Sequence, residues 1–125
     1  MVKTIVSMLL VALILLGGAI WESNYIKKEF NELHSSLEIV YEKVDDQTAT
    51  MDDIYSLQKM WLKKKKTLHM IVPHTELKEI DLWIAETATL VRDEEWKDAI
   101  SKIEVLLELT EQIPQTFTIQ FSNIF

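Results

Sequence analysis

The sequence predicts an all-α protein, in which an N-terminal transmembrane helix is followed by an antiparallel bundle of about four helices. Three observations lead to this fold class. An uncharged apolar run spans Thr4–Trp21, later apolar residues recur at spacings of three and four, and no glycine follows Gly18 while only Pro73 and Pro114 interrupt the rest. These spacings are typical of one helical face. A chain poor in glycine and proline is typical of helices joined by short turns rather than of strands and hairpins.

The apolar run TIVSMLLVALILLGGAIW would form a helix of about 27 Å, close to the roughly 30 Å of bilayer hydrocarbon. Lys3 precedes it, and Trp21 and Tyr25 follow it at the depth where aromatic side chains suit the membrane interface. The core helices of soluble proteins rarely carry so long an uncharged stretch. We therefore expect a single-pass anchor in the cell membrane, in contact with membrane lipid.

A cleaved signal peptide is the competing interpretation of the same run. Ile5–Leu16 has the length of a signal-peptide apolar region, and Gly17, Gly18 and Ala19 offer small residues for cleavage. The uncleaved anchor is favoured because the charged region before the run is thin and the helical pattern continues past Trp21. The chain contains no cysteine, which excludes a lipoprotein-type anchor.

Length and charge suggest one small domain behind the anchor. The expected organisation is a transmembrane anchor at 1–21, a helical bundle at 22–113 and an apolar C-terminal tail at 114–125 that packs on the bundle or the membrane. All 20 acidic residues and 12 of the 13 basic ones follow the run, so this part carries −8 (12 − 20). Such an acidic surface argues against nucleic-acid binding. A short N-terminal tail before a long domain favours an extracytoplasmic domain.

The first soluble helix is predicted to continue from the membrane helix to about Asp45. Its apolar residues form a seven-residue seam on one face. This 26–44 seam consists of Ile26, Phe30, Leu33, Leu37, Val40 and Val44. A parallel coiled-coil dimer and one helix of an intramolecular bundle both explain it. The bundle is favoured because about three heptads are short for an isolated coiled coil, and apolar partner helices follow.

The second helix is predicted to begin after a polar turn at Asp45–Ala49. Thr50 and Asp53 resemble a capping box with a shorter acid. The apolar residues of this helix again fall at heptad spacing: Ile54, Leu57, Trp61, Leu68 and Ile71. Lys64 occupies a seam position, where its stem can lie along the seam while its ammonium reaches water. Pro73 is expected to end the helix.

Two further helices are predicted before the tail. Thr75 is the expected cap of the third helix, and Asp93 that of the fourth, with Glu94 and Glu95 in its first turn. The buried face of the third helix comprises Leu77, Ile80, Ile84, Thr87 and Val91, and that of the fourth comprises Trp96, Ala99, Ile103, Leu106, Thr110 and Ile113. Pro114 follows the fourth helix. The tail TFTIQFSNIF fits either a helical face or a strand.

Several motifs occur in a fixed order along the chain. An N-terminal anchor is followed by Trp61, HTELKEID at His74–Asp81, EEWKDAI at Glu94–Ile100 and NIF at Asn123–Phe125. This order resembles the domain-of-unknown-function family 4363, short anchored proteins of spore-forming Gram-positive bacteria, over the whole chain. The resemblance implies a bacterial, single-pass, mostly helical protein with no assigned activity. The family motif corresponds here to His74, Thr75, Glu76, Ile80 and Asp81.

Only His69, His74, Glu76 and Asp81 form a cluster of ligand-type side chains. Their spacings differ from the i, i+3 or i+4 pattern of helical metal sites. We therefore expect His74, Thr75 and Glu76 to cap a helix, and Asp81 to pair with Lys78 or Lys64. No pattern resembles a nucleophile with its base, a phosphate loop or a catalytic carboxylate pair. The sequence thus predicts no enzyme, no cofactor and no metal.

A run of four lysines has a predicted place in the bundle. If the first two soluble helices pair antiparallel about Gln47, the run Lys63, Lys64, Lys65 and Lys66 lies beside residues 28–31, about 15 Å beyond the membrane. Our hypothesis is that this run and the tail brace the domain against anionic lipid headgroups. The alternative is a solvated helix face.

The predicted function is that of a non-enzymatic, partner-binding or structural accessory protein at the cell envelope, with an unknown protein partner. One alternative is a ligand- or metal-binding sensor module that uses His74, Glu76 and Asp81. The other is an anchor that self-associates as a homodimer through the 26–44 seam.

Overall fold

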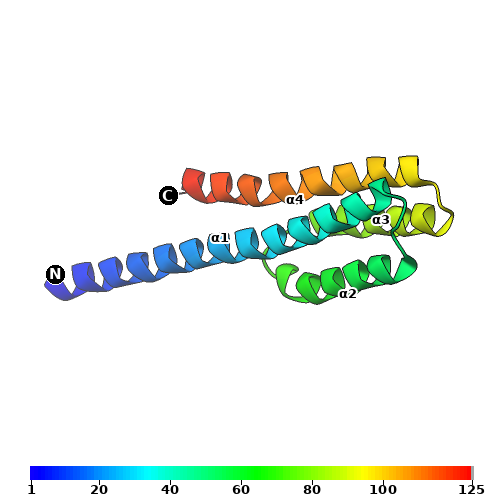
Figure 1. Ribbon diagram of the computed structural model, residues 1–125. Coiled ribbons are helices and arrows are strands. Elements are labelled where there is room, and N and C mark those ends of the chain that lie inside the picture. Colours follow the sequence, from blue (N-terminus) through cyan, green and yellow to red (C-terminus); the bar gives the residue numbers. More distant parts are fainter. Residues whose placement is uncertain (125) are drawn as a thin grey trace.

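The computed structural model describes the backbone of residues 1–124 and the side chains of residues 1–116. Within these residues the chain forms four helices and no strand: α1 (Val2–Asp45), α2 (Met51–Leu68), α3 (His74–Arg92) and α4 (Trp96–Ile124). The helices run alternately in opposite directions (Figure 1). Each packs on the next, and α4 also packs on α1, which closes the four into a ring. The predicted all-α fold class is therefore confirmed.

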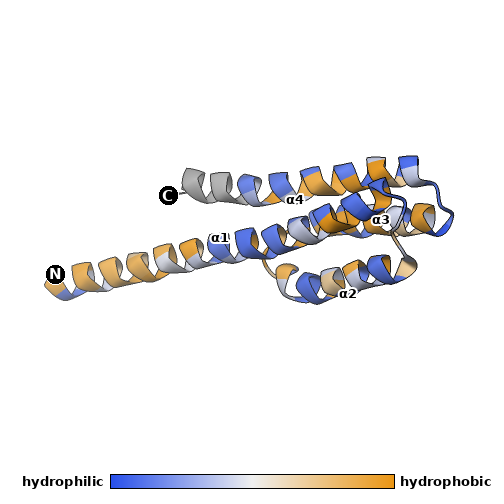
Figure 2. Ribbon diagram, viewed as in Figure 1, coloured by the Kyte–Doolittle hydropathy of each residue, from blue (hydrophilic) through white to orange (hydrophobic). Residues whose placement is uncertain are grey.

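Helix α1 is one continuous helix in two different environments. Its N-terminal part projects alone from the bundle and consists mainly of apolar residues (Figures 1 and 2). From Ile26 onward, the same helix packs against its neighbours and ends at Asp45, as expected from the sequence. The helix that carries the apolar run and the helix that carries the 26–44 seam are thus the same element.

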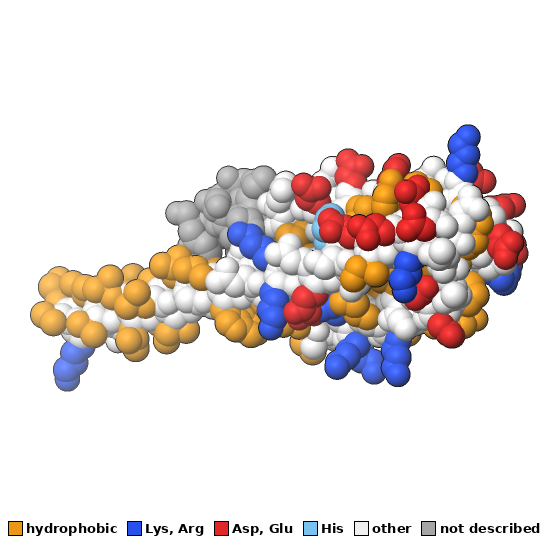
Figure 3. Space-filling model, in the orientation of Figure 1, with side chains coloured by type: hydrophobic (Ala, Val, Ile, Leu, Met, Phe, Trp, Pro, Cys, Tyr) orange, Lys and Arg blue, Asp and Glu red, His pale blue; other side chains and the backbone are white. Residues whose placement is uncertain are grey.

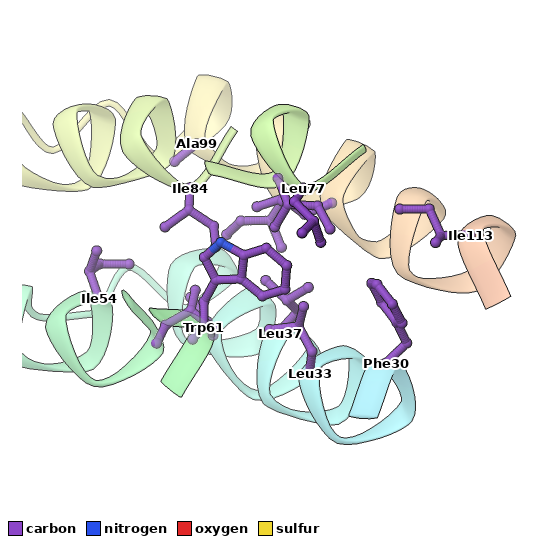
Figure 4. Close-up of a cluster of buried hydrophobic side chains, with 14 of the residues drawn as sticks. Phe30, Leu33, Leu37, Ile54, Trp61, Leu77, Ile84, Ala99 and Ile113 are labelled. Atoms are coloured by element: carbon purple, nitrogen blue, oxygen red, sulfur yellow. The ribbon is translucent and has the colours of Figure 1, made fainter. Parts of the chain in front are cut away.

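The core lies inside the ring of helices and is built from one face of each. All six residues of the 26–44 seam are buried within the chain. Trp61 of α2 lies centrally, between Leu33 and Leu37 of α1 and Ile84 of α3 (Figure 4). Since the seam packs on the chain's own helices, the intramolecular bundle is the arrangement that the structure shows.

Helix α2 lies farther from its neighbours than α4 does. The backbones of α1 and α3 approach α4 more closely than they approach α2. The distance between packed helices depends on the side chains at the contact. Two large side chains, Trp61 and Lys64, are buried on the inward face of α2 and fill this wider space.

Helices α1 and α3 both end in a left-handed residue that is not glycine. Gln47 and Glu94 have φ values of 58° and 57°, in the left-handed region. After α1, Gln47 N–H donates to Val44 O and Thr48 N–H to Lys43 O; after α3, Glu94 N–H donates to Val91 O and Glu95 N–H to Leu90 O. These paired bonds form a Schellman motif at each helix end, a position that usually holds glycine.

Replacing Glu94 with Gly is expected to raise the free energy of unfolding by about 1 kcal/mol, because glycine adopts the left-handed conformation without the clash of a side chain. The matched control is Glu104→Gly, the same change at an exposed position inside α4. That variant is expected to lose about 1 kcal/mol. Urea unfolding in detergent, followed by circular dichroism, measures both. Loss of stability in both variants would contradict the assigned role of Glu94.

The structure confirms one predicted cap and corrects two. Thr50 accepts from Asp53 N–H while the Asp53 carboxylate accepts from Thr50 N–H, which completes the capping box of α2. Thr75 caps nothing, since α3 begins at His74 with Pro73 at the N-cap. Asp93 ends α3 instead of beginning α4, because the left-handed Glu94 turns the chain there and delays α4 until Trp96.

Two predicted helix ends were also wrong. The sequence predicted that the second helix runs to Pro73 and includes Ile71. Helix α2 ends earlier, at Leu68, and Ile71 lies half-buried in the turn that follows. Helix α4 does not stop at Ile113 but continues through Pro114 to Ile124. A proline inside a helix removes one backbone hydrogen bond. Here Ile113 and Pro114 are both buried, and this packing favours the continued helix. The side chains of the tail after Thr116 lie outside the described residues.

Candidate functional site

The most conspicuous surface of the molecule is the uncovered apolar segment of α1. Side chains such as Leu9, Leu13 and Ile14 are exposed to 61%, 66% and 66%, and none of the most apolar 18-residue window is buried inside the bundle. One helix near the N-terminus is therefore long and apolar enough to cross a membrane. Trp21 and Tyr25 stack at its end with ring centroids 5.6 Å apart.

A buried lysine lies about two to three helical turns beyond this segment, beside Glu29 and Glu32 of α1. Lys64 is 8% exposed, and its Nζ donates to Glu29 Oε2 at 2.9 Å and to Glu32 Oε2 at 2.5 Å. The prediction that its ammonium reaches water was wrong, because two carboxylates of α1 meet it first. The contacts confirm the predicted pairing of this part of α2 with α1 about residue 30.

The ion pairs change the protonation equilibria of both partners. Burial of Lys64 opposes its charged form, but its hydrogen bonds to Glu32 and Glu29 outweigh that effect and raise the lysine pKa. The hydrogen bond from Lys64 is also the main cause of the lowered pKa of Glu32. Near the other end of α2, Lys43 Nζ donates to Asp53 Oδ1 at 2.8 Å, and this hydrogen bond is the main cause of the lowered pKa of Asp53.

These shifts predict a plateau of stability with a fall at each end of the pH range. The contributions of Glu32 and Asp53 are present above their ordinary pKa values of 4.5 and 3.8, and they are lost as pH falls through the lower folded values. The contribution of Lys64 is fully present below 10.5 and is lost as pH rises through its raised folded value. Thermal unfolding midpoints in detergent from pH 2 to pH 12 test this. In Lys64→Met the alkaline fall should shrink, and an unchanged profile would contradict the assignment.

A second polar cluster joins α2 to α3. Asp81 accepts from Trp61 Nε1 at 2.6 Å and pairs with Lys65 Nζ at 2.6 Å. Asp81 therefore pairs with Lys65, where the sequence predicted Lys78 or Lys64. This carboxylate satisfies the indole N–H at the edge of the core, so its role here is to hold α2 against α3.

The remaining residues of the predicted ligand cluster do not gather around Asp81. His69, His74 and Thr75 are exposed at or beside the α2–α3 turn, and Glu76 is half-buried. No group of three His, Asp or Glu side chains in the described part of the chain lies close enough to hold a metal ion. The motif at residues 74–81 thus supplies the start of α3 and one bond to Trp61.

The four-lysine run divides into two paired and two unpaired residues. Lys64 and Lys65 are held by the carboxylates of Glu29, Glu32 and Asp81. Lys63 and Lys66 are exposed, and within the described residues neither forms an ion pair. The helical period explains the division, because four successive residues point to different sides of α2.

A third polar cluster, which sequence reasoning missed, joins α1 to α4. His34 Nδ1 lies 2.9 Å from Thr110 Oγ1, and His34 Nε2 lies 3.0 Å from Glu38 Oε1. The order hydroxyl, imidazole, carboxylate is that of a catalytic triad. However, Thr110 is 2% exposed and its hydroxyl donates to Leu107 O. The cluster therefore holds two helices together, and only the i, i+4 spacing of His34 and Glu38 was visible in the sequence.

The surface of the bundle carries shallow, open grooves. One groove between α1 and α2 encloses about 210 Å³ and is lined by apolar side chains such as Ile39 and Met60, with Lys43 and Asp53 at its end. Another runs between α1 and α4 beside His34 and Pro114. Both are open to solvent along much of their length, unlike the enclosed pockets that bury small ligands.

The fold and these contacts define an up-and-down four-helix protein whose first helix extends beyond the bundle as an apolar segment. A family model described as a domain of unknown function (DUF4363) matches residues 20–124. Since the match covers more than half of the chain, the chain belongs to this family. The match takes in the whole bundle and leaves out most of the apolar segment. No curated protein and no solved structure matches the chain.

Proposed function

We propose that this chain is a single-pass, membrane-anchored, non-enzymatic accessory protein of the bacterial cell envelope. Its bundle stands outside the cytoplasm and offers a surface to a protein partner. The observation that carries this proposal is the continuity of α1, which runs without a break from the exposed apolar segment into the core. A helix that continues through residues 17–19 supports an uncleaved anchor, since removal of the segment would cut within a regular helix.

The character of the bundle supports a structural or binding role over a catalytic one. The polar clusters of the described side chains join pairs of helices, and the grooves are shallow. Self-association through the 26–44 seam would require the bundle to open, because the seam residues are buried within one chain. A partner would instead contact the outer faces. The family resemblance to anchored proteins of Gram-positive bacteria supports the envelope as the setting.

The test is protease accessibility of a C-terminal tag on protoplasts, combined with the mass of the cell-associated protein. The expected result is a full-length protein whose tag is cut from outside. A protected tag on a full-length protein would overturn the orientation. A product shortened by about 19 residues would overturn the anchor in favour of a signal peptide.

A pair of matched variants tests the anchor itself. Leu10→Asp with Leu13→Asp places two charges in the apolar segment, each costing about 3 kcal/mol in a bilayer, and should release the protein from the membrane fraction. Leu62→Asp, at an exposed position of α2, should leave it bound.

A further inference from the structure

We propose that four lysines at the membrane-proximal end of the bundle bind the headgroups of anionic phospholipids. These proximal lysines are Lys27 and Lys28 of α1 and Lys63 and Lys66 of α2. The inference rests on the proposed membrane anchor and adds to it a lipid class and a binding surface. It differs from the surface that the four-lysine run alone predicts, since two members of the run are excluded and two lysines of α1 are added.

The antiparallel contact of α1 with α2 brings the proximal lysines to the same end of the bundle, where Lys27 borders the groove between α1 and α4. Lys64 bonds to Glu29, and Tyr25 Oη donates to Thr67 Oγ1 at 2.7 Å. These contacts place the last turns of α2 beside the turns of α1 that follow Trp21. At about 1.5 Å per residue, Lys27 and Lys28 lie about 10 Å past Trp21. This is close to the 8–10 Å over which surface charges act at physiological salt.

The proximal lysines are exposed to solvent, although Lys28 lies close enough to Glu32 to help lower the pKa of that carboxyl. All four are exposed, and none forms an ion pair within the part of the chain that the structure describes. Their neighbours Lys64 and Lys65, by contrast, are occupied by carboxylates of α1 and α3. Lys64 and Lys65 thus offset two of the three negative charges of Glu29, Glu32 and Asp81.

The acids that stay unpaired at this end belong to α1, α3 and α4. Glu76 and Glu79 belong to α3, away from the proximal lysines, whereas Glu22 belongs to α1 and Glu111 of α4 lines the same groove as Lys27. Lysines accordingly gather over α2 and where α1 leaves the bundle, while acids gather over the opposite side and the far end (Figure 3). Lys63 and Lys66 therefore lie on a basic α2 side of the proximal end, whereas Lys27 shares the α1–α4 groove with Glu111.

Charge is also unequal along the bundle axis. The distal half, residues 34–59 and 84–109, has 5 basic and 13 acidic residues, a net charge of −8. The proximal half, residues 22–33, 60–83 and 110–124, has 7 of each and a net charge of zero. An anionic surface repels the distal half and attracts only the proximal lysines. Charge complementarity thus favours the lipid surface as their occupant.

The test uses the full-length chain in lipid vesicles. Because the chain has no cysteine, Met70→Cys gives a single labelling position in the exposed α2–α3 turn, where Met70 is 80% exposed. A donor dye is attached to this cysteine, and an acceptor dye is attached to either an anionic or a zwitterionic lipid in the vesicle. Energy transfer between the two dyes is measured as the mole fraction of the acceptor lipid is raised. The expected result is transfer to the anionic acceptor at a lower mole fraction, with the preference lost in 1 M salt.

Variants separate the proximal lysines from charge in general. Lys63→Gln with Lys66→Gln should weaken the anionic preference by about 25-fold, at about fivefold for each lysine. Lys59→Gln with Lys97→Gln removes the same charge from exposed distal positions and should leave the preference intact. If the labelled protein with all of its lysines shows equal transfer to both acceptors, the lipid site is overturned but the membrane anchor is not. No transfer to either acceptor would overturn the anchor as well.

Discussion

Replacing Trp61 with Ala is expected to lower the free energy of unfolding by about 3–5 kcal/mol. The indole is 2% exposed and fills the wide space between α2, α1 and α3 (Figure 4). Its removal leaves a cavity that the neighbouring backbones cannot close without moving α2. It also removes the donor that Asp81 accepts from at 2.6 Å. Urea unfolding of the full-length protein in detergent, followed by circular dichroism, measures the change.

Two controls separate the volume of Trp61 from its hydrogen bond. Trp61→Phe keeps most of the ring but loses the indole N–H, and should cost about half as much as Trp61→Ala or less. Leu62→Ala changes the next residue, which is 56% exposed, and should stay within about 0.5 kcal/mol of the wild type. A similarly small effect for Trp61→Ala would mean that α2 contributes little to the folded bundle.

Replacing Lys64 with Ala is expected to cost about 3 kcal/mol. The change leaves the Glu29 carboxylate, whose side chain is 15% exposed, without its cation in the space between α1 and α2. Removing one member of a buried pair is costly because the other charge remains desolvated. Glu32, at 48% exposure, can turn to water and should contribute less. The same unfolding measurement applies.

A double variant tests whether the cost comes from the orphaned charge. Lys64→Leu with Glu29→Leu replaces both members with apolar residues and should recover most of the lost stability, since apolar replacements of buried ion pairs are often neutral or stabilising. Lys66→Ala removes an exposed lysine two residues away and should change little. If the double variant is less stable than Lys64→Ala, the ion pair itself stabilises the bundle.

The core of the fold was predictable because each helix repeats its apolar residues on one face. Every residue of the 26–44 seam is buried, and so are Ile54, Leu57, Trp61 and Leu68 of the second helix. The capping box at Thr50 was also visible, because both of its partners lie within four residues. Patterns of this kind depend on local spacing, which a sequence displays directly.

The features that escaped prediction depend on contacts between helices or on unusual backbone. The partners of Lys64 and Asp81 lie on other helices, and choosing among nearby side chains of opposite charge requires the axial register to about one turn. The helix ends at Gln47 and Glu94 carry no glycine to mark them. Proline normally ends a helix, yet α4 continues through Pro114 because Ile113 and Pro114 are buried together. The candidate site is made of such contacts, so less of it could be predicted.

Because α1 is unbroken, the bundle and the apolar segment must tilt together as one rigid body. Residues 22–45 extend about 36 Å beyond the apolar segment at about 1.5 Å per residue. With that segment in a bilayer, a tilt of about 10° moves the far end by about 6 Å. Helices tilt when the hydrocarbon layer becomes thinner than their apolar length. The position of the acidic far end would then follow bilayer thickness, because no flexible joint interrupts α1 between the membrane and the core.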